Sequence, residues 1–167
     1  MNKALYNTDF NLWLEENAHL LHKGFLQDID VEHLIEEIEG LAQSQKQALK
    51  SNLRIVIIHL LKYKYQPEKI TDSWVNSINE HRDRIYDILD DSPSLRQYIR
   101  DELSKVYARA RKRASRETQK PLDVFPIECP FTIEQVLYED YLPKKNWNQP
   151  KISKYGEITV SNYRELQ

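Results

Sequence analysis

The sequence predicts an all-α protein: an antiparallel four-helix bundle, then an extended proline-rich segment, a short fifth helix and an irregular C-terminal tail. Two observations carry this prediction. Apolar residues recur at spacings of three and four along most of the chain, which is the period of a helix face. Only 3 glycines occur in 167 residues, so few positions suit the tight turns of hairpins and nucleotide-binding loops. The motifs GxGxxG and GxxxxGK[ST] are both absent.

The four long helices follow from the apolar spacing and from residues typical of helix ends. Thr8 or Asp9 can cap the first helix, and Gly24 suits a left-handed stop after it. Ser92 and Pro93 together are a restart signal for the fourth. The predicted helices cover about residues 8–23, 28–67, 71–91 and 92–119.

Residues 55–67, IVIIHLLKYKYQP, are the most informative stretch. They are apolar nearly all round a helix, with His59 in the middle, so we expect this stretch to be buried on several sides. A helix of this kind forms the centre of a folded domain.

Two regions are expected, a helical bundle domain over residues 1–143 and a tail over 144–167. Three prolines after residue 120 favour an extended segment across the bundle. Thr132 with Gln135 has the spacing of a capping box and opens the short fifth helix, which Pro143 ends. The tail could form short strands or a loose arm.

Charge is distributed unevenly, although the net charge is only −2. Residues 1–40 hold 2 basic and 9 acidic groups, whereas residues 96–120 hold 9 basic and 3 acidic groups. Either the acidic hairpin packs beside the basic helix, or the basic helix contacts an anionic partner, which could be nucleic acid or an acidic protein. An acidic cluster comprises Glu36, Glu37 and Glu39; a basic face comprises Lys105, Arg109, Lys112 and Arg116.

His59 and His81 are the two histidines in apolar settings. The helices that carry them are joined by a short turn, so the two side chains are expected at similar depths of an antiparallel pair. In one interpretation the two histidines are structural, and each neutral ring donates one N–H to a buried partner. In the alternative, the two histidines and a carboxylate such as Glu80 or Asp83 bind a metal ion.

No catalytic constellation is found, and no catalytic residue, metal site or cofactor is predicted. GxSxG is absent, and the single cysteine, Cys129, has no histidine near it in the sequence. One cysteine cannot form an internal disulfide, and neither a membrane-length apolar run nor a signal-peptide pattern is present. The sequence therefore predicts a cytoplasmic protein without membrane contact and leans away from an enzyme.

Six stretches in order resemble a bacterial family catalogued as domain of unknown function 29, over about residues 5–143. They include LYNTDFNLWLEENAHLL at 5–21, DIDVEHLIEEIEGL at 28–41 and FPIECPFTIEQVL at 125–137. The resemblance implies a compact helical bundle and brings no activity, cofactor or partner. The landmarks that match the family are Asp9, Trp13, Glu36, Glu39, His59, Lys62, Trp74 and Arg82.

Three functions remain open. The first is a protein-interaction module that binds another protein or itself, which follows from the missing catalytic groups and the uneven charge. The second is a metal protein or enzyme centred on His59 and His81. The third is nucleic-acid binding through residues 96–120. The candidate functional cluster comprises His59, Lys62, Trp74, His81 and Arg82.

Overall fold

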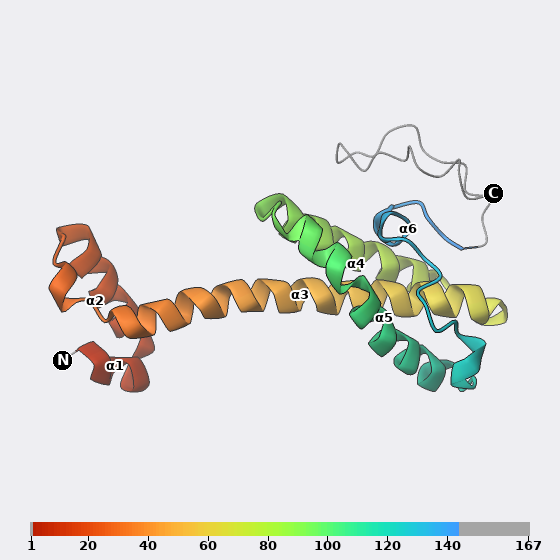
Figure 1. Ribbon diagram of the computed structural model, residues 1–167, viewed down its shortest axis with the longest axis horizontal. Helices are drawn as coiled ribbons and strands as arrows, with labels where there is room; N and C mark the ends of the chain where they lie inside the picture. Colours follow the sequence, from red (N-terminus) through yellow and green to blue (C-terminus); the bar gives the residue numbers. More distant parts are fainter. Residues whose placement is uncertain (1, 144–167) are drawn as a thin grey trace. The chain divides into compact units, whose positions relative to one another are not determined.

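The computed structural model describes residues 2–143, and its regular elements in that range are all helical (Figure 1). The all-α prediction is therefore confirmed, while the tail predicted for 144–167 lies outside the described residues. The α-helices of residues 2–143 are α1 (Asn2–Thr8), α2 (Phe10–Lys23), α3 (Val31–Tyr65), α4 (Asp72–Asp91), α5 (Leu95–Thr118) and α6 (Ile133–Leu137). Short 3₁₀ turns occur at Leu26–Asp28, Pro67–Lys69 and Leu122–Val124. Among the described helices, none is long and apolar enough to cross a bilayer.

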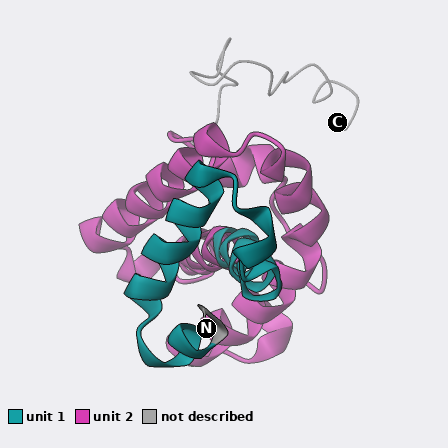
Figure 2. Ribbon diagram, turned by 90° about the vertical axis from the view of Figure 1, so that its left-hand side faces the viewer, with its two compact units in different colours: residues 1–46 teal, residues 47–167 magenta. Residues whose placement is uncertain are grey.

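The chain divides into two compact units, Met1–Lys46 and Gln47–Gln167 (Figure 2). The boundary falls inside α3, which is continuous over 35 residues. Gly40 lies within this helix rather than at a break. The prediction of four antiparallel helices in one domain stays a prediction, as does the division at residue 143.

The core lies in residues 47–143. The second half of α3 contributes the largest share. Six of the thirteen residues of the predicted 55–67 stretch are buried, while Lys64 and Pro67 are exposed and the others are half-buried. Helices α4 and α5 and the segment around α6 supply the rest of the same apolar cluster. The buried residues of α3 are Leu49, Leu53, Val56, Ile57, Ile58, Leu60 and Leu61.

Contacts between side chains give the directions of the long helices in this unit. Asn52 of α3 contacts His81 of α4, whereas Lys62, further along α3, lies over Trp74 near the start of α4. From the first contact to the second, the residue numbers increase along α3 and decrease along α4, so the two helices are antiparallel. Lys62 also pairs with Glu117 near the end of α5, which returns in the direction of α3.

Several helix ends form as their local sequence predicts. Asp9 caps α2 by accepting a hydrogen bond from the Leu12 N–H at 3.1 Å, and Gly24 ends that helix with φ 75°. Thr132 and Gln135 form the predicted capping box of α6. The predicted start of α5 at Ser92 is wrong by a few residues, because Ser92 closes α4 and α5 begins at Leu95.

Two of the three buried residues in the described part of residues 2–46 are polar, namely Asn17 and Asp30. The third is Trp13, whose indole N–H donates to Asp30 Oδ2 at 3.1 Å. Asn17 closes the same network: its amide donates to the Trp13 carbonyl, and its Oδ1 accepts from the Asp30 N–H. His33 lies 2.6 Å from the same Asp30 oxygen. The turn between α2 and α3 is thus fixed by hydrogen bonds, beside a ring cluster in which Tyr6 and Phe10 pack against Trp13.

Candidate functional site

Part of the predicted histidine cluster assembles where α3 meets α4. The His59 and Trp74 rings lie 6.5 Å apart, and Lys62 Nζ lies 4.6 Å from the Trp74 ring centroid. The same ammonium lies 3.2 Å from Glu117 Oε2. Lys62 of α3 therefore contacts the Trp74 ring of α4 and the Glu117 carboxylate of α5 at once, and these contacts connect the three helices.

The two histidines differ in their hydrogen bonding. His81 Nδ1 contacts Asn52 Oδ1 at 2.7 Å, as expected for a structural histidine. His59 Nδ1 is buried and has no hydrogen-bond partner within the described residues, so this atom does not make the expected bond to a buried partner. Burial, with a further contribution from the Lys62 charge, lowers the pKa of His59 to about 4, so the ring is neutral at pH 7.

The metal reading gains no ligand set from the geometry. Within residues 2–143, no three histidine, cysteine, aspartate or glutamate side chains converge as an ion would require.

Arg82 belongs to a different part of the fold. Its guanidinium is almost completely buried and donates hydrogen bonds to main-chain carbonyls within and after α6, at 2.8 Å for Val136 O and 3.0 Å for Tyr141 O. Burial lowers the pKa of Arg82 to about 10, which leaves it charged at neutral pH. This residue acts as a clamp that ties the C-terminal segment to α4. Its remaining acceptors are the carbonyls of Gln135 and Glu139.

The three glutamates of the acidic cluster do not converge on one point. Glu37 accepts a hydrogen bond from the Tyr6 hydroxyl at 2.6 Å, and this bond raises the pKa of Tyr6 to about 12. Glu36 and Glu39 are exposed along α3. They give a charged flank to the helix rather than a ligand set.

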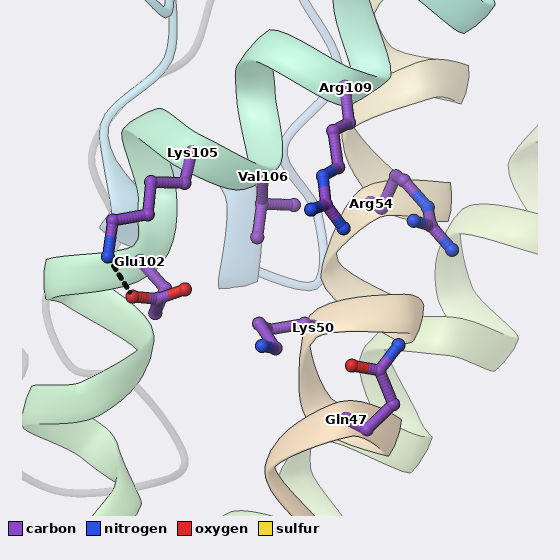
Figure 3. Close-up of a pocket in the computed structure, with 7 residues that line it drawn as sticks. All are labelled: Gln47, Lys50, Arg54, Glu102, Lys105, Val106 and Arg109. Atoms are coloured by element: carbon purple, nitrogen blue, oxygen red, sulfur yellow. Dashed lines mark hydrogen bonds and ion pairs between the residues drawn. The ribbon is translucent and has the colours of Figure 1, made fainter.

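The predicted basic face divides in the structure. Lys105 and Arg109 line a cavity of about 80 Å³ between α5 and α3, whereas Lys112 and Arg116 lie outside it (Figure 3). The opposite wall of the cavity carries Lys50 and Arg54. Gln47, Glu102 and Val106 complete its lining.

Much of the positive charge of residues 96–120 is already paired within the chain. Five of the nine basic residues in that range form ion pairs with carboxylates, and Arg111 binds two main-chain carbonyls. The five are Arg96, Arg100, Lys105, Arg113 and Lys120. A helix that binds a nucleic-acid backbone needs several cations free for phosphates, so this pairing counts against the third function.

Lys50 and Arg54 were not among the predicted site residues. They lie on α3, about fifty residues before the basic helix, so charge counting along the chain does not join the two sets. Their signal in the sequence is the four-residue spacing of Lys46, Lys50 and Arg54, which places three cations on one helix flank.

The exposed apolar residues are concentrated in the first unit. Ten of the thirteen exposed large hydrophobic residues of the described chain lie in residues 1–46. Four of them, Val31, Ile35, Ile38 and Leu41, share one face of α3, where Ile38 is 64% and Leu41 is 70% exposed. We call these four the α3 stripe. The others are Phe10, Leu12, Leu14, Leu21, Phe25 and Leu26.

Comparison with known families gives one match. Residues 5–142 match the family described as "Domain of unknown function DUF29", nearly the range over which the sequence resembles it. No curated protein and no solved structure matches the chain.

Proposed function

We infer that this chain, which belongs to the DUF29 family, is a protein-interaction module whose binding surface is the exposed apolar face of residues 1–46. One observation carries the proposal: this unit has ten of the thirteen exposed large hydrophobic residues and one buried one. Four of the ten form the α3 stripe on one face of a helix, and an exposed apolar face is typical of sites that another molecule covers.

The charge beside the α3 stripe supports a particular partner. Glu32, Glu36 and Glu39 lie along one flank of it, and residues 1–40 hold 9 acidic against 2 basic groups. A partner segment that is apolar on one side and basic along its edges complements both properties. An amphipathic helix with lysine or arginine flanks has this chemistry, and it would dock along the stripe.

The other two functions have weaker support. The histidines bring no third ligand with them in residues 2–143, and the basic helix uses most of its cations internally. An interaction module requires neither a metal site nor unpaired cations. It is the function that a positive observation supports, namely the exposed apolar residues of the first unit.

The test uses a synthetic helix of alternating leucine and lysine faces as the probe. Binding to the full chain is measured by fluorescence anisotropy, and a peptide with glutamate in place of lysine serves as the charge control. We expect saturable binding of the lysine peptide only. The variant Ile35→Ser with Ile38→Ser and Leu41→Ser should weaken binding by about tenfold or more, because three anchors are lost.

A matched variant replaces exposed apolar residues of the second unit, Leu122, Val124 and Ile127, with serine. It should bind like the native chain. Equal binding by all three proteins, or none by the native chain, would reject the α3 stripe as an interaction surface. Light scattering over a concentration series establishes whether the chain also associates with itself.

A further inference from the structure

We propose that the cavity between α3 and α5 binds a small phosphate-type oxyanion through Lys50, Arg54 and Arg109. This site lies wholly in residues 47–143 and is independent of the α3 stripe. Nothing in the family description assigns a ligand to it.

The geometry brings cations from two helices to one concave space. Lys50 and Arg54 lie one turn apart on α3 with their charged ends turned to opposite sides, and Arg109 points from α5 into the space between them (Figure 3). Arg54 Nε is buried and has no hydrogen-bond partner in the part of the chain that the structure describes. A guanidinium whose hydrogen-bonding capacity is not used within the chain has donors left for an acceptor from outside.

The charge balance of the cavity favours an anion. Four cations line it, namely Lys50, Arg54, Lys105 and Arg109, and they face one carboxylate, Glu102. That carboxylate is already engaged, since Lys105 Nζ donates to Glu102 Oε1 at 2.7 Å. The hydrogen bond from Lys105 lowers the pKa of Glu102, and the charges of Lys50 and Arg109 add to this shift.

The remaining three cations are not neutralised inside the chain. Among residues 2–143, neither Lys50, Arg54 nor Arg109 forms an ion pair. Two guanidinium groups and an ammonium at one cavity offer forked and single donors together, a combination suited to the oxygens of a phosphate group.

The size of the cavity selects a small ligand over a nucleic-acid duplex. A volume of about 80 Å³ exceeds the ~10–15 Å³ that one water molecule needs in such a cavity and suits a single oxyanion group. A duplex would instead need cations in a row along an open face. Lys112 and Arg116, which would extend such a row, lie outside the cavity.

The experiment titrates the full chain with inorganic phosphate by isothermal calorimetry at constant ionic strength, with chloride as the reference salt. A second titration with glycerol phosphate distinguishes a phosphate ester from the free ion, since tighter binding of the ester assigns the site to esters. We expect saturable binding that the double variant Arg54→Gln with Arg109→Gln weakens by about tenfold or more, because charge-assisted hydrogen bonds are lost.

Two further proteins make the result decisive. Arg84→Gln removes an exposed arginine that pairs with Glu80 on α4, and it should bind phosphate within about twofold of the native chain. Arg54→Lys keeps the charge and removes the fork, so intermediate binding is expected. The proposal is overturned if no saturable phosphate binding occurs, or if the folded double variant binds as tightly as the native chain.

Discussion

Residues 1–46 and residues 47–143 are built from helices with the same three-and-four spacing of apolar residues, yet they bury these residues to opposite extents. The second unit contains 23 buried hydrophobic residues in one cluster. The first has Trp13 alone, with Asp30 and Asn17 as its buried polar companions. Helix α3 runs through both units, so one helix displays the two cases.

The difference shows that apolar residues at helical spacing predict which face of a helix is apolar. They do not predict whether another element covers that face. In the second half of α3, helices α4 and α5 cover the apolar face, and burial of this kind stabilises the fold. In the first half, the α3 stripe has the same spacing and remains exposed. Hydrogen bonds around Asp30 and ring contacts among Tyr6, Phe10 and Trp13 hold that unit together instead.

The largest expected effect separates two leucines of α3. Leu61 is fully buried and Leu41 is 70% exposed. Leu61→Ala should lower the free energy of unfolding by about 2–5 kcal/mol, because it leaves a cavity. Leu41→Ala should change it by less than about 0.5 kcal/mol. Urea denaturation followed by circular dichroism measures both, and equal losses would mean that residue 41 is covered in the folded protein.

A second comparison tests the clamp at Arg82. Arg82→Met removes its hydrogen bonds and leaves buried carbonyls without donors, so we expect a loss of about 3 kcal/mol. Amide exchange should accelerate in residues 133–141, which the clamp holds. The control Arg84→Met breaks an exposed pair and should cost less than about 0.5 kcal/mol. Slow exchange at 133–141 in the Arg82 variant would refute the clamp.

Asp30 provides the corresponding test in the first unit. Burial acts to raise the pKa of Asp30, but hydrogen bonds from His33 and Trp13 outweigh it and hold the pKa below 3.8. The folded state therefore gains stability from the ionised carboxylate above the unfolded pKa, and this gain is lost as the pH falls through the folded value.

Asp30→Asn should cost about 1–2 kcal/mol at neutral pH, through weaker hydrogen bonds. Amide exchange of residues 10–34 reports the loss, because these residues form the network. The difference between variant and native chain should shrink in acid. A difference that is the same at neutral and acid pH would exclude an ionised Asp30 as its source.

The smallest expected effect is at His59. His59→Leu removes a ring whose Nδ1 has no hydrogen-bond partner among the described residues, so stability should change by less than about 1 kcal/mol at pH 7. With its pKa lowered to about 4, the native ring costs stability as the pH falls from 6.5 toward 4, since the unfolded chain takes up the proton first. The leucine variant should lack that part of the acid slope. An unchanged slope in calorimetric unfolding would show that His59 titrates normally.

The features that could be predicted from sequence are the local ones. Asp9, Gly24 and the Thr132–Gln135 pair act within one turn of their own helix, so a short window contains the whole interaction. The burial of most of residues 55–61 could also be predicted, because a stretch that is apolar nearly all round a helix has little surface suited to water.

The remaining features depend on what lies opposite each residue in space. Lys50 and Arg54 meet Arg109 only after α4 reverses the chain and α5 returns along α3. The exposure of Ile38 and Leu41 depends on the absence of covering neighbours, which spacing does not encode. Arg82 looked functional because it is a family landmark, and its role is a contact with the backbone of a distant segment.

That contact has a consequence for engineering. Arg82 holds residues 135–141 by hydrogen bonds to main-chain oxygens, so these bonds do not require particular side chains in that segment. Glu139 and Asp140 are exposed there, and their negative charges favour the charged form of the buried guanidinium, which acts against the lowering of the Arg82 pKa by burial. Replacements that keep an acidic group at these two positions should therefore leave the anchor beneath them intact.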